Sequence, residues 1–345
     1  MDASVRIPID HTSQCFGARR AALDMAGKLG FSEVCAGRVG IVITEVCTNI
    51  LKHAGRGEVL LRAGDTDGAH ASLELLALDK GPGMENVEKC LADGYSTGSS
   101  GQGGGMGQGL GAIQRLSDES DFYSVPGEGA AVLARWNPEP AKTAPARYGA
   151  DSVLTVGAVN VCKHGEEVCG DSWGIEERDG VYTILVADGL GHGPEARQAS
   201  LAAVHILRGN SDKPPAMLID LAHKALRSLR GAAVSVVRLD PAAGRLSFSG
   251  LGNVAAQIYL GTDRSQHLVS VNGTAGHHAA SIREFAYTWP SNGILIVHSD
   301  GLATGARLNA NFGLAQHDPA LIAGVLYRDF ARGHDDATVV VAKAA

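Results

Sequence analysis

The sequence lacks several features that mark common classes of protein. No run of Lys or Arg occurs among its 345 residues and the formal net charge is −7, so we expect no nucleic-acid binding. No apolar stretch approaches the roughly 18 residues needed to span a bilayer. Residues 1–10 also lack the basic and apolar regions of a signal peptide. We therefore expect a cytoplasmic protein that binds neither nucleic acid nor membrane.

The six cysteines exclude a zinc framework. None forms a C-x-x-C pair, and no histidine accompanies them at zinc-ligand spacing. Cys47 falls on the apolar face of a predicted helix, so we expect a core residue rather than a reactive thiol. We interpret all six as reduced thiols: Cys15, Cys35, Cys47, Cys90, Cys162 and Cys169.

Glycine, by contrast, is abundant, with 45 residues. These glycines follow no period, which excludes a collagen helix, and they cluster in loops beside short apolar runs, as ligand-binding turns do. The length allows two domains. The segment Pro138–Ala150 is rich in Pro and Ala and has no apolar periodicity, which is typical of a linker. We predict an N-terminal domain over 1–137, a linker over 138–150 and a C-terminal domain over 151–345.

Apolar spacing predicts an α+β fold for the N-terminal domain, with helices on one face of a sheet. Helices are predicted over Cys15–Leu29, Ala36–Ala54 and Leu110–Leu116. A turn is predicted at Gly64–Gly68, and the predicted strands are Glu58–Arg62, Ala71–Leu78, Asp121–Val125 and Ala130–Trp136.

The C-terminal domain contains many short β-type runs interrupted by two helical stretches, Glu195–Arg208 and Met217–Leu229. This order favours two antiparallel sheets packed together and flanked by helices. The predicted strands are Ser152–Val161, Asp171–Glu177, Tyr182–Ala187, Ala233–Asp240, Arg245–Gly250, Ala255–Leu260, Gly293–Ser299 and Thr338–Ala342.

Two motifs in the N-terminal domain carry side chains suited to a nucleotide. In the helical segment EVCTNILKHA, Glu45 and Asn49 lie one turn apart and point to one side, as do Lys52 and His53. The amide oxygen of Asn49 can bind Mg²⁺, and Glu45 can accept a proton or orient a nucleophile. In the segment DKGPGM, Asp79 ends a strand, and its carboxylate could accept a hydrogen bond from the exocyclic amine of adenine.

A glycine-rich run then leads into the last predicted helix of this domain. Free N–H groups at the start of that helix, within Gly103–Gly111, would form an anion site for phosphates. No G-x-x-x-x-G-K-[ST] loop is present, and the glycines miss the dinucleotide-binding register. Each motif alone also fits a solvated helix face, a turn or a flexible linker. Their joint order favours a nucleotide site.

Four acidic clusters stand beside predicted strands of the C-terminal domain. Carboxylates at strand ends can converge at one edge of a sheet pair, and oxygen ligands without His or Cys select Mg²⁺ or Mn²⁺. Two such ions, roughly 3.5–4 Å apart, can hold a hydroxide for attack on a phosphate monoester. A single Asp-Gly pair is more often a turn, but four beside buried-looking strands favour a metal site. The clusters contain Asp171, the D-G-L-G-H-G string that begins at Asp188, the S-D-G string around Asp300, and Asp335-Asp336.

Two further residues in the D-G-L-G-H-G string carry chemistry. Gly189 leaves its backbone carbonyl accessible as a metal ligand. His192 fits either a general acid or a packing residue. His277 and His278 lie in a loop rich in Gly and Ala, and we expect them to be solvated.

Residues 5–136 resemble the GHKL ATPase fold, the Bergerat α/β sandwich, and within it the small anti-sigma and switch protein kinases of bacterial stress regulation. The strings EVCTNILKHA, DKGPGM and GMGQGLGAIQRLSDESDFYS are similar to that family's N, G1 and G2 boxes. The resemblance implies that Glu45 is the catalytic base, that Asn49 binds Mg²⁺ and that Asp79 contacts adenine.

The same resemblance assigns the glycines. Gly81 and Gly83 would shape the adenine pocket, and the phosphates would be covered by Gly107, Gly109 and Gly111. The insert Gly98–Gly105 is longer and richer in glycine than the family pattern. The family phosphorylates Ser or Thr on small STAS-domain proteins, with ATP and Mg²⁺.

Residues 151–345 resemble the SpoIIE-like branch of the metal-dependent (PPM) protein phosphatases, an αββα sandwich. The strings D-G-L-G-H-G, S-D-G and D-D-A-T carry the match, and G-L-G-N at 250–253 is most similar to the small stressosome phosphatases. The resemblance implies that Asp188 and the Gly189 carbonyl bind the first metal. The pair would be completed by Asp171, Asp300 and Asp335, with Asp336 as the alternative in the last motif.

One position of the phosphatase pattern has no counterpart. No arginine stands at an obvious phosphate-binding position near the start of the domain, and Lys163 is the candidate in its place.

Together the resemblances imply a cytoplasmic stress-response switch. The C-terminal domain would dephosphorylate phospho-Ser or phospho-Thr on a STAS-domain protein with two Mg²⁺ or Mn²⁺ ions. The N-terminal domain would bind ATP with Mg²⁺ and phosphorylate such a partner. The alternative is a phosphatase whose N-terminal domain only senses nucleotide or docks a partner.

Overall fold

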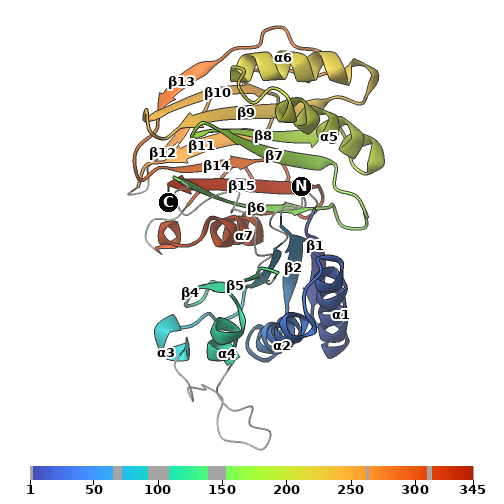
Figure 1. Cartoon of the computed structure of the whole chain (residues 1–345), viewed down its shortest axis with the longest axis vertical. Coiled ribbons are helices and arrows are strands. Elements are labelled where there is room, and N and C mark those ends of the chain that lie inside the picture. Colours follow the sequence, from blue (N-terminus) through green and yellow to red (C-terminus); the bar gives the residue numbers. More distant parts are fainter. Residues whose placement is uncertain are drawn as a thin grey trace, which may run out of the picture. The chain divides into compact units, whose positions relative to one another are not determined.

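The computed structural model describes residues 3–64, 72–91, 109–138, 153–261, 264–308 and 313–344. The chain divides into two compact units, residues 2–149 and 150–345, each with its own sheets and helices (Figure 1). The predicted linker beyond Pro138, the turn at Gly64–Gly68 beyond its first residue, and the insert Gly98–Gly105 lie outside the described residues.

The N-terminal unit is one antiparallel sheet with helices on one face (Figure 1). Strands occur in the order β1 (Val5–Ile9), β2 (Gly57–Ala63), β3 (Leu73–Asp79), β5 (Gly129–Trp136) and β4 (Glu119–Val125). The helices are α1 (Thr12–Lys28), α2 (Glu33–Asn49), α3 (Val87–Leu91) and α4 (Gly109–Leu116), and α2 continues into a π-helical turn, Ile50–Ala54.

The core of this unit lies between the sheet and its helices. Leu73 and Leu75 alternate along β3 toward the helices, while Val39 and Ile43 recur at helical spacing along α2, and all four are fully buried. Burying a side chain of this size contributes roughly 1.5–3 kcal/mol. The two periods, 2 and 3.6, are the signals that predicted these elements.

The helical segment Glu33–Ala54 corrects two expectations. It is long enough and apolar enough, with a mean hydropathy of 1.5, to pass the composition test for a membrane span, although no such stretch was expected. Part of that apolar surface, 44% of the window, is buried, and Val39, Ile43 and Val46 belong to the core, so packing accounts for its composition. The helix is also not α-helical to Ala54, because it changes to π geometry after Asn49.

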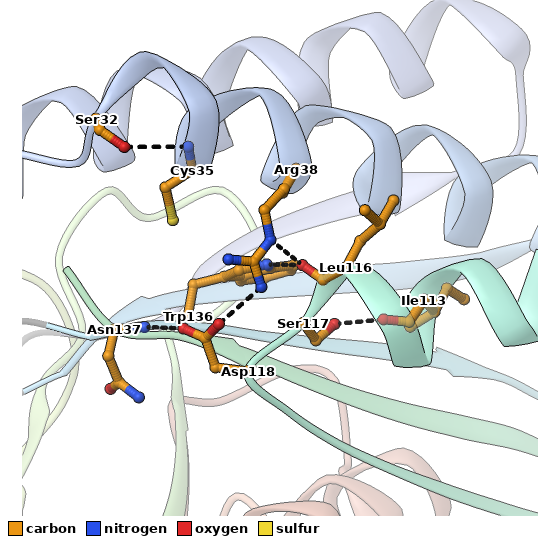
Figure 2. A network of polar contacts seen from close by, with 9 residues as sticks. All are labelled: Ser32, Cys35, Arg38, Ile113, Leu116, Ser117, Asp118, Trp136 and Asn137. Atoms are coloured by element: carbon orange, nitrogen blue, oxygen red, sulfur yellow. Dashed lines mark hydrogen bonds and ion pairs between the residues drawn. The ribbon is translucent and has the colours of Figure 1, made fainter. Parts of the chain in front are cut away.

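A polar network fixes α2 against the end of α4 (Figure 2). The Leu116 carbonyl accepts hydrogen bonds from Arg38 Nε (3.0 Å) and from the Trp136 indole (2.7 Å). Arg38 also pairs with Asp118 at 2.7 Å, and Asp118 accepts the backbone N–H of Asn137. Because charged hydrogen bonds are the stronger ones, this network sets where α4 lies relative to α2.

The C-terminal unit is built from two five-stranded antiparallel sheets, which confirms the predicted arrangement. One sheet has the order β13 (Phe285–Thr288), β10 (Arg245–Leu251), β9 (Ala232–Asp240), β8 (Val181–Gly189), β7 (Asp171–Arg178). The other has the order β12 (Ser265–His267), β11 (Ala255–Tyr259), β14 (Ile294–His298), β15 (Ala337–Ala344), β6 (Leu154–Val161).

Helices cover the outer faces of these sheets (Figure 1). The first sheet packs against α5 (Pro194–Arg208) and α6 (Pro215–Ala225), and α7 (Pro319–Phe330) packs on β6 and β15 of the second. The close approach of α7 requires Gly157, because a β-carbon there would collide with the Ala320 backbone. A separate apolar core fills the space between the sheets. The αββα sandwich therefore follows, with α7, β12 and β13 added to the predicted elements.

All six cysteines are free thiols, as predicted. Cys47 is fully buried, and burial together with the neighbouring Cys15 raises the pKa of its thiol to about 12. It is therefore a core residue with no thiolate at neutral pH.

Candidate active sites

In the N-terminal unit, the first and third nucleotide motifs meet at Gly109. Glu45 and Asn49 are half-buried, one turn apart on α2, and Gly109 begins α4. A β-carbon at Gly109 would collide with Oε1 of Glu45 and lie 3.3 Å from Nδ2 of Asn49. A side chain at Gly109 would therefore displace the Glu45 carboxylate.

The second motif is a turn built on Asp79. One carboxylate oxygen of Asp79 accepts the backbone N–H of Gly81 at 2.8 Å and of Ala130 at 3.2 Å. A β-carbon at Gly81 would lie 2.6 Å from that of Ala54, at the end of the π turn. Gly83 has a φ of 71° and would collide with the Val125 carbonyl if it carried a side chain. Both glycines are therefore required by close backbone packing around Asp79.

The π turn lies between these motifs. Because its hydrogen bonds reach one residue further than those of an α-helix, the α-helical spacing that placed Lys52 and His53 beside Glu45 does not hold after Asn49. Burial and the neighbouring Lys52 lower the pKa of His53, while the Asp79 carboxylate acts in the opposite direction.

The structure thus brings Glu45, Asn49 and Gly109 together, and it places Asp79, Gly81 and Gly83 in one turn. Gly111 is buried within α4. Gly107 lies outside the described residues, so the phosphate-covering role of this glycine stays a prediction.

In the C-terminal unit, the acidic residues gather around one strand pair. Asp171 begins β7 and lies directly opposite Asp188 near the end of β8. The register is set by the two-residue turn Asp179-Gly180, whose φ values of 55° and 76° are those of a type I′ hairpin. Like charges at opposed positions destabilise a sheet, so this pairing is unfavourable unless a proton or a cation neutralises it.

The cluster shifts the acidity of both opposed residues. Burial raises the pKa of Asp171 to about 7, although hydrogen bonds from Ser299 and Thr338 lower it in part. Burial also raises the pKa of Asp188 to about 9, and four negative charges add to the effect: Asp171, Asp300, Asp335 and Asp336. All five aspartates named from the sequence are therefore close enough to interact electrostatically.

The two residues of the last motif differ in their surroundings. Asp336 is buried, and its two oxygens accept the backbone N–H groups of Lys163 at 2.8 Å and Gly170 at 2.9 Å. Asp335 is half-buried and accepts the N–H of Asp336. Asp336 thus closes the loop between β6 and β7, to which Lys163 contributes its backbone.

Asp300 has a partner that the sequence reasoning missed. The side-chain amide of Asn253 donates to Oδ2 of Asp300 at 2.6 Å. Asn253 is the last residue of the G-L-G-N string, so the string itself was the available signal. Gly301, which follows Asp300, packs on the backbone of Asp336, where any side chain would collide.

One carboxylate oxygen of the cluster is suited to bind a cation. Asp171 is 1% exposed, and within the described residues its Oδ2 has no hydrogen-bond partner. A buried, unsatisfied carboxylate oxygen is unfavourable unless it binds a cation or a proton. The described side chains do not form a closed group of three or more carboxylate, imidazole or thiol ligands.

Two ion pairs lie at the rim of the cluster, both outside the sequence predictions. His192 Nδ1 lies 2.6 Å from Oε1 of Glu166, and the histidine side chain is 47% exposed. Arg230 Nε lies 2.5 Å from Oε2 of Glu195, at the start of α5. His277 and His278 are exposed, as expected, and Nε2 of His277 also lies 2.7 Å from the Arg230 carbonyl.

Comparison with known proteins identifies both units. Residues 10–136 match the histidine kinase-like ATPase domain family, and residues 178–345 match the family of stage II sporulation protein E (SpoIIE). The chain is 36% identical over 120 residues to serine/threonine-protein kinase RsbT of Bacillus subtilis (strain 168), covering 34% of this chain and 86% of RsbT.

Two other relatives complete the comparison. Phosphoserine phosphatase RsbX of the same organism is 24% identical over 140 residues, covering 41% of this chain and 70% of RsbX. A solved structure described as "The bacterial stressosome: a modular system that has been adapted to control secondary messenger signaling" is 26% identical with a TM-score of 0.51, covering 55% of this chain and 99% of that one.

The predicted fold class is therefore confirmed for both domains, as is the type of enzyme domain that each represents. The chain belongs to the RsbT-like serine/threonine-protein kinase family through its N-terminal, GHKL-type domain, and it joins that domain to a SpoIIE-type protein phosphatase domain related to RsbX.

Proposed function

We propose that this chain is a cytoplasmic signalling switch with two opposed activities. The C-terminal domain removes phosphate from phospho-Ser or phospho-Thr of a STAS-domain protein, using two Mg²⁺ or Mn²⁺ ions. The N-terminal domain binds ATP with Mg²⁺ and phosphorylates such a partner. The observation that carries the phosphatase proposal is the buried Asp171 opposite Asp188, with one carboxylate oxygen unsatisfied among the described residues. The kinship with RsbT and with a stressosome protein supports the choice of partner.

Five groups would hold the metal ions. They are the carboxylates of Asp171, Asp188, Asp300 and Asp335 and the carbonyl of Gly189. Asp336 is assigned to loop closure instead, because both of its oxygens already accept backbone N–H groups. When bound, such ions supply an activated water and neutralise phosphate charge.

His192 is assigned to proton transfer. With Nδ1 directed at Glu166, the imidazole keeps Nε2 for delivering a proton to the departing serine or threonine oxygen. Glu166 would hold the ring in that orientation, as a carboxylate does for a catalytic histidine.

In the N-terminal domain, Asn49 would bind Mg²⁺ and Glu45 would take the proton of the attacking hydroxyl. Asp79 would contact adenine through the turn it shares with Gly81 and Gly83. Gly109 keeps the start of α4 beside Glu45 and Asn49, where its N–H groups would face the phosphates together with those of Gly107 and Gly111.

The test follows the mass of a STAS-domain protein in three reactions with ATP, Mg²⁺ and Mn²⁺: wild type, Asp188→Asn and Glu45→Gln. We expect phosphate to accumulate on the partner only when Asp188 is replaced and Glu45 is intact. If wild type removes phosphate but no variant adds it, the N-terminal domain is a nucleotide sensor or docking module. If wild type leaves the phosphorylated partner unchanged, the phosphatase proposal is wrong for that partner.

The raised pKa values of Asp171 and Asp188 predict that the stability of the protein depends on pH. In the unfolded chain, aspartate loses its proton near pH 4, whereas Asp171 and Asp188 keep theirs in the metal-free fold up to about pH 7 and 9. The folded state therefore binds more protons between these limits, and the free energy of unfolding falls as pH rises. We expect urea unfolding with a chelator to show this decline between pH 5 and 8, and saturating Mn²⁺ to oppose it. A flat profile without metal would contradict the cluster.

Asn253→Ala tests the partner of Asp300. Without the amide, Asp300 loses the hydrogen bond that orients its carboxylate, so the Mn²⁺ concentration for half-maximal phosphatase activity should rise about 10–100-fold. Asn210→Ala is the control, because that amide donates to Ile206 at the end of α5 away from the cluster. Equal metal requirements in the two variants would remove Asn253 from the site.

A further inference from the structure

The phosphate group of the substrate needs a positively charged side chain in the phosphatase site. A phosphate monoester carries about two negative charges at pH 7, and the cluster that would receive it is lined by aspartates. Metal ions offset part of this repulsion, but selective binding of a phosphate generally uses guanidinium groups, which bond two oxygens at once. No arginine occurs among residues 153–177, the described start of the domain, to fill this role.

The fold brings an arginine to the site from a distant segment. A β-carbon built on Gly191, within the D-G-L-G-H-G string, would lie 3.0 Å from Nη1 of Arg230. A β-carbon on Gly170 would lie 2.7 Å from Oδ2 of Asp336 and 3.6 Å from the Gly191 carbonyl. The guanidinium therefore lies beside Gly191, and the same loop passes close to Gly170, which packs against Asp336.

The backbone around Arg230 is fixed to that same loop. The Gly231 carbonyl accepts the N–H of Leu190 at 3.0 Å. The Arg230 carbonyl contacts the imidazole of His277 at 2.7 Å, and Ala232 pairs with Ala275. Arg230 thus projects from a well-anchored backbone, which gives its side chain a defined position beside the loop.

The present partner of Arg230 is one that a phosphate can replace. Its side chain is 50% exposed and that of Glu195 is 67% exposed. Ion pairs this exposed contribute little to stability, about 0–1 kcal/mol. A phosphate dianion offers more charge and a better match to the two N–H edges of a guanidinium.

We propose that Arg230 is the substrate-binding arginine of the phosphatase domain, and that it exchanges Glu195 for the phosphate group of phosphoserine or phosphothreonine. Glu195 holds the guanidinium in place before substrate arrives and competes with the phosphate. This assignment rests on the phosphatase function proposed above. It also fits Gly191, whose φ of 85° favours glycine and whose β-carbon position lies 3.0 Å from Nη1.

The experiment compares Arg230→Ala, Arg230→Lys and Glu195→Gln with wild type, loaded with Mn²⁺. Substrates are the phosphorylated STAS-domain partner and p-nitrophenyl phosphate. For Arg230→Ala we expect KM to rise about tenfold or more with kcat within about threefold, since a charged hydrogen bond to the bound phosphate is lost. Arg230→Lys should recover part of the loss. Glu195→Gln should lower KM about two- to threefold by removing the competitor, a gain that a structural role would not produce.

Arg227→Ala is the matched control. Arg227 is exposed and lies in the same segment, and Arg227→Ala removes the same charge. The assignment fails if Arg230→Ala and Arg227→Ala have equal KM values, or if Arg230→Ala lowers kcat alone. Calorimetric titration of inorganic phosphate into each Mn²⁺-loaded protein separates this assignment from the proposed function. If phosphate binding is weaker only in Arg230→Ala, the assignment of Arg230 is supported, even when wild type cleaves neither substrate. Failure of wild type to cleave both substrates would instead reject the phosphatase proposal.

Discussion

Replacing Asp188 by asparagine is expected to lower phosphoserine hydrolysis about a thousandfold or more while making the metal-free protein more stable. The loss follows because Asp188 would ligate the ions that activate water, and their contribution of several kcal/mol corresponds to three or more powers of ten in rate. The gain follows because a carboxylate opposite Asp171 is unfavourable in the folded state, and asparagine has the same shape without the charge.

The expected gain in the free energy of unfolding follows from the raised pKa of Asp188. With a pKa of about 9 in the fold against an ordinary 3.8, Asp188 holds at neutral pH a proton that the unfolded chain has released. Each pH unit above 3.8 lowers the unfolding free energy by about 1.4 kcal/mol, so a gain on the order of 4 kcal/mol is expected for the variant at pH 7. Urea unfolding in the presence of a chelator measures it.

Asp179→Asn is the control for both effects. Asp179 lies in the turn of the same hairpin with its side chain 93% exposed, and its φ of 55° suits asparagine equally well. We expect wild-type hydrolysis and stability within about 0.5 kcal/mol. An Asp188→Asn protein that keeps full activity, or that is less stable than wild type without metal, would contradict the placement of Asp188 in a metal-binding cluster.

Glu45→Gln is expected to lower phosphoryl transfer by about a hundred- to ten-thousandfold, the usual contribution of a general base. The affinity for ATP should stay within about threefold of wild type, because glutamine keeps the shape beside Gly109 and only the proton acceptor is lost. Transfer is best measured in the Asp188→Asn background, where the product is not hydrolysed again. Calorimetry gives the affinity for ATP.

Two further variants serve as comparisons for Glu45→Gln. Glu33→Gln, an exposed change in the first turn of the same helix, should leave transfer unchanged. Gly109→Ala should weaken ATP binding as well as transfer, since its methyl group would displace the carboxylate and move the start of α4. Undiminished transfer by Glu45→Gln would support the alternative reading, in which this domain senses nucleotide or docks a partner.

The parts of the structure that could be predicted are those with local signals. Alternation and helical spacing located the strands and helices that bury one face. The register that opposes Asp171 and Asp188 was also within reach, because the Asp179-Gly180 pair is a strong two-residue hairpin signal. By contrast α7 has apolar residues on all sides, so no amphipathic period marks it. The edge strand β1 is short and contains Pro8, which argues against a strand.

The contacts that escaped prediction join segments far apart in sequence. Asn253 reaches Asp300 across 47 residues, and Arg230 reaches Gly191 through the packing of the segment before β9 against the D-G-L-G-H-G loop. His192 and Glu166 are closer in sequence, but their pairing depends on the loop that Asp336 closes. Each contact is set by tertiary packing. The G-L-G-N string marked Asn253 as a residue of interest, but residue type and spacing did not identify its partner.

The pairing of β6 with β15 also sets the order in which the two domains can fold during synthesis. Ala337 to Ala344 align with Val161 to Leu154, so the second sheet stays incomplete until a strand some 180 residues downstream has left the ribosome. In the part of the chain that the structure describes, the sheet of the N-terminal domain is complete at Trp136. During translation each nascent chain should therefore acquire a folded kinase-type domain first and a phosphatase-type domain last.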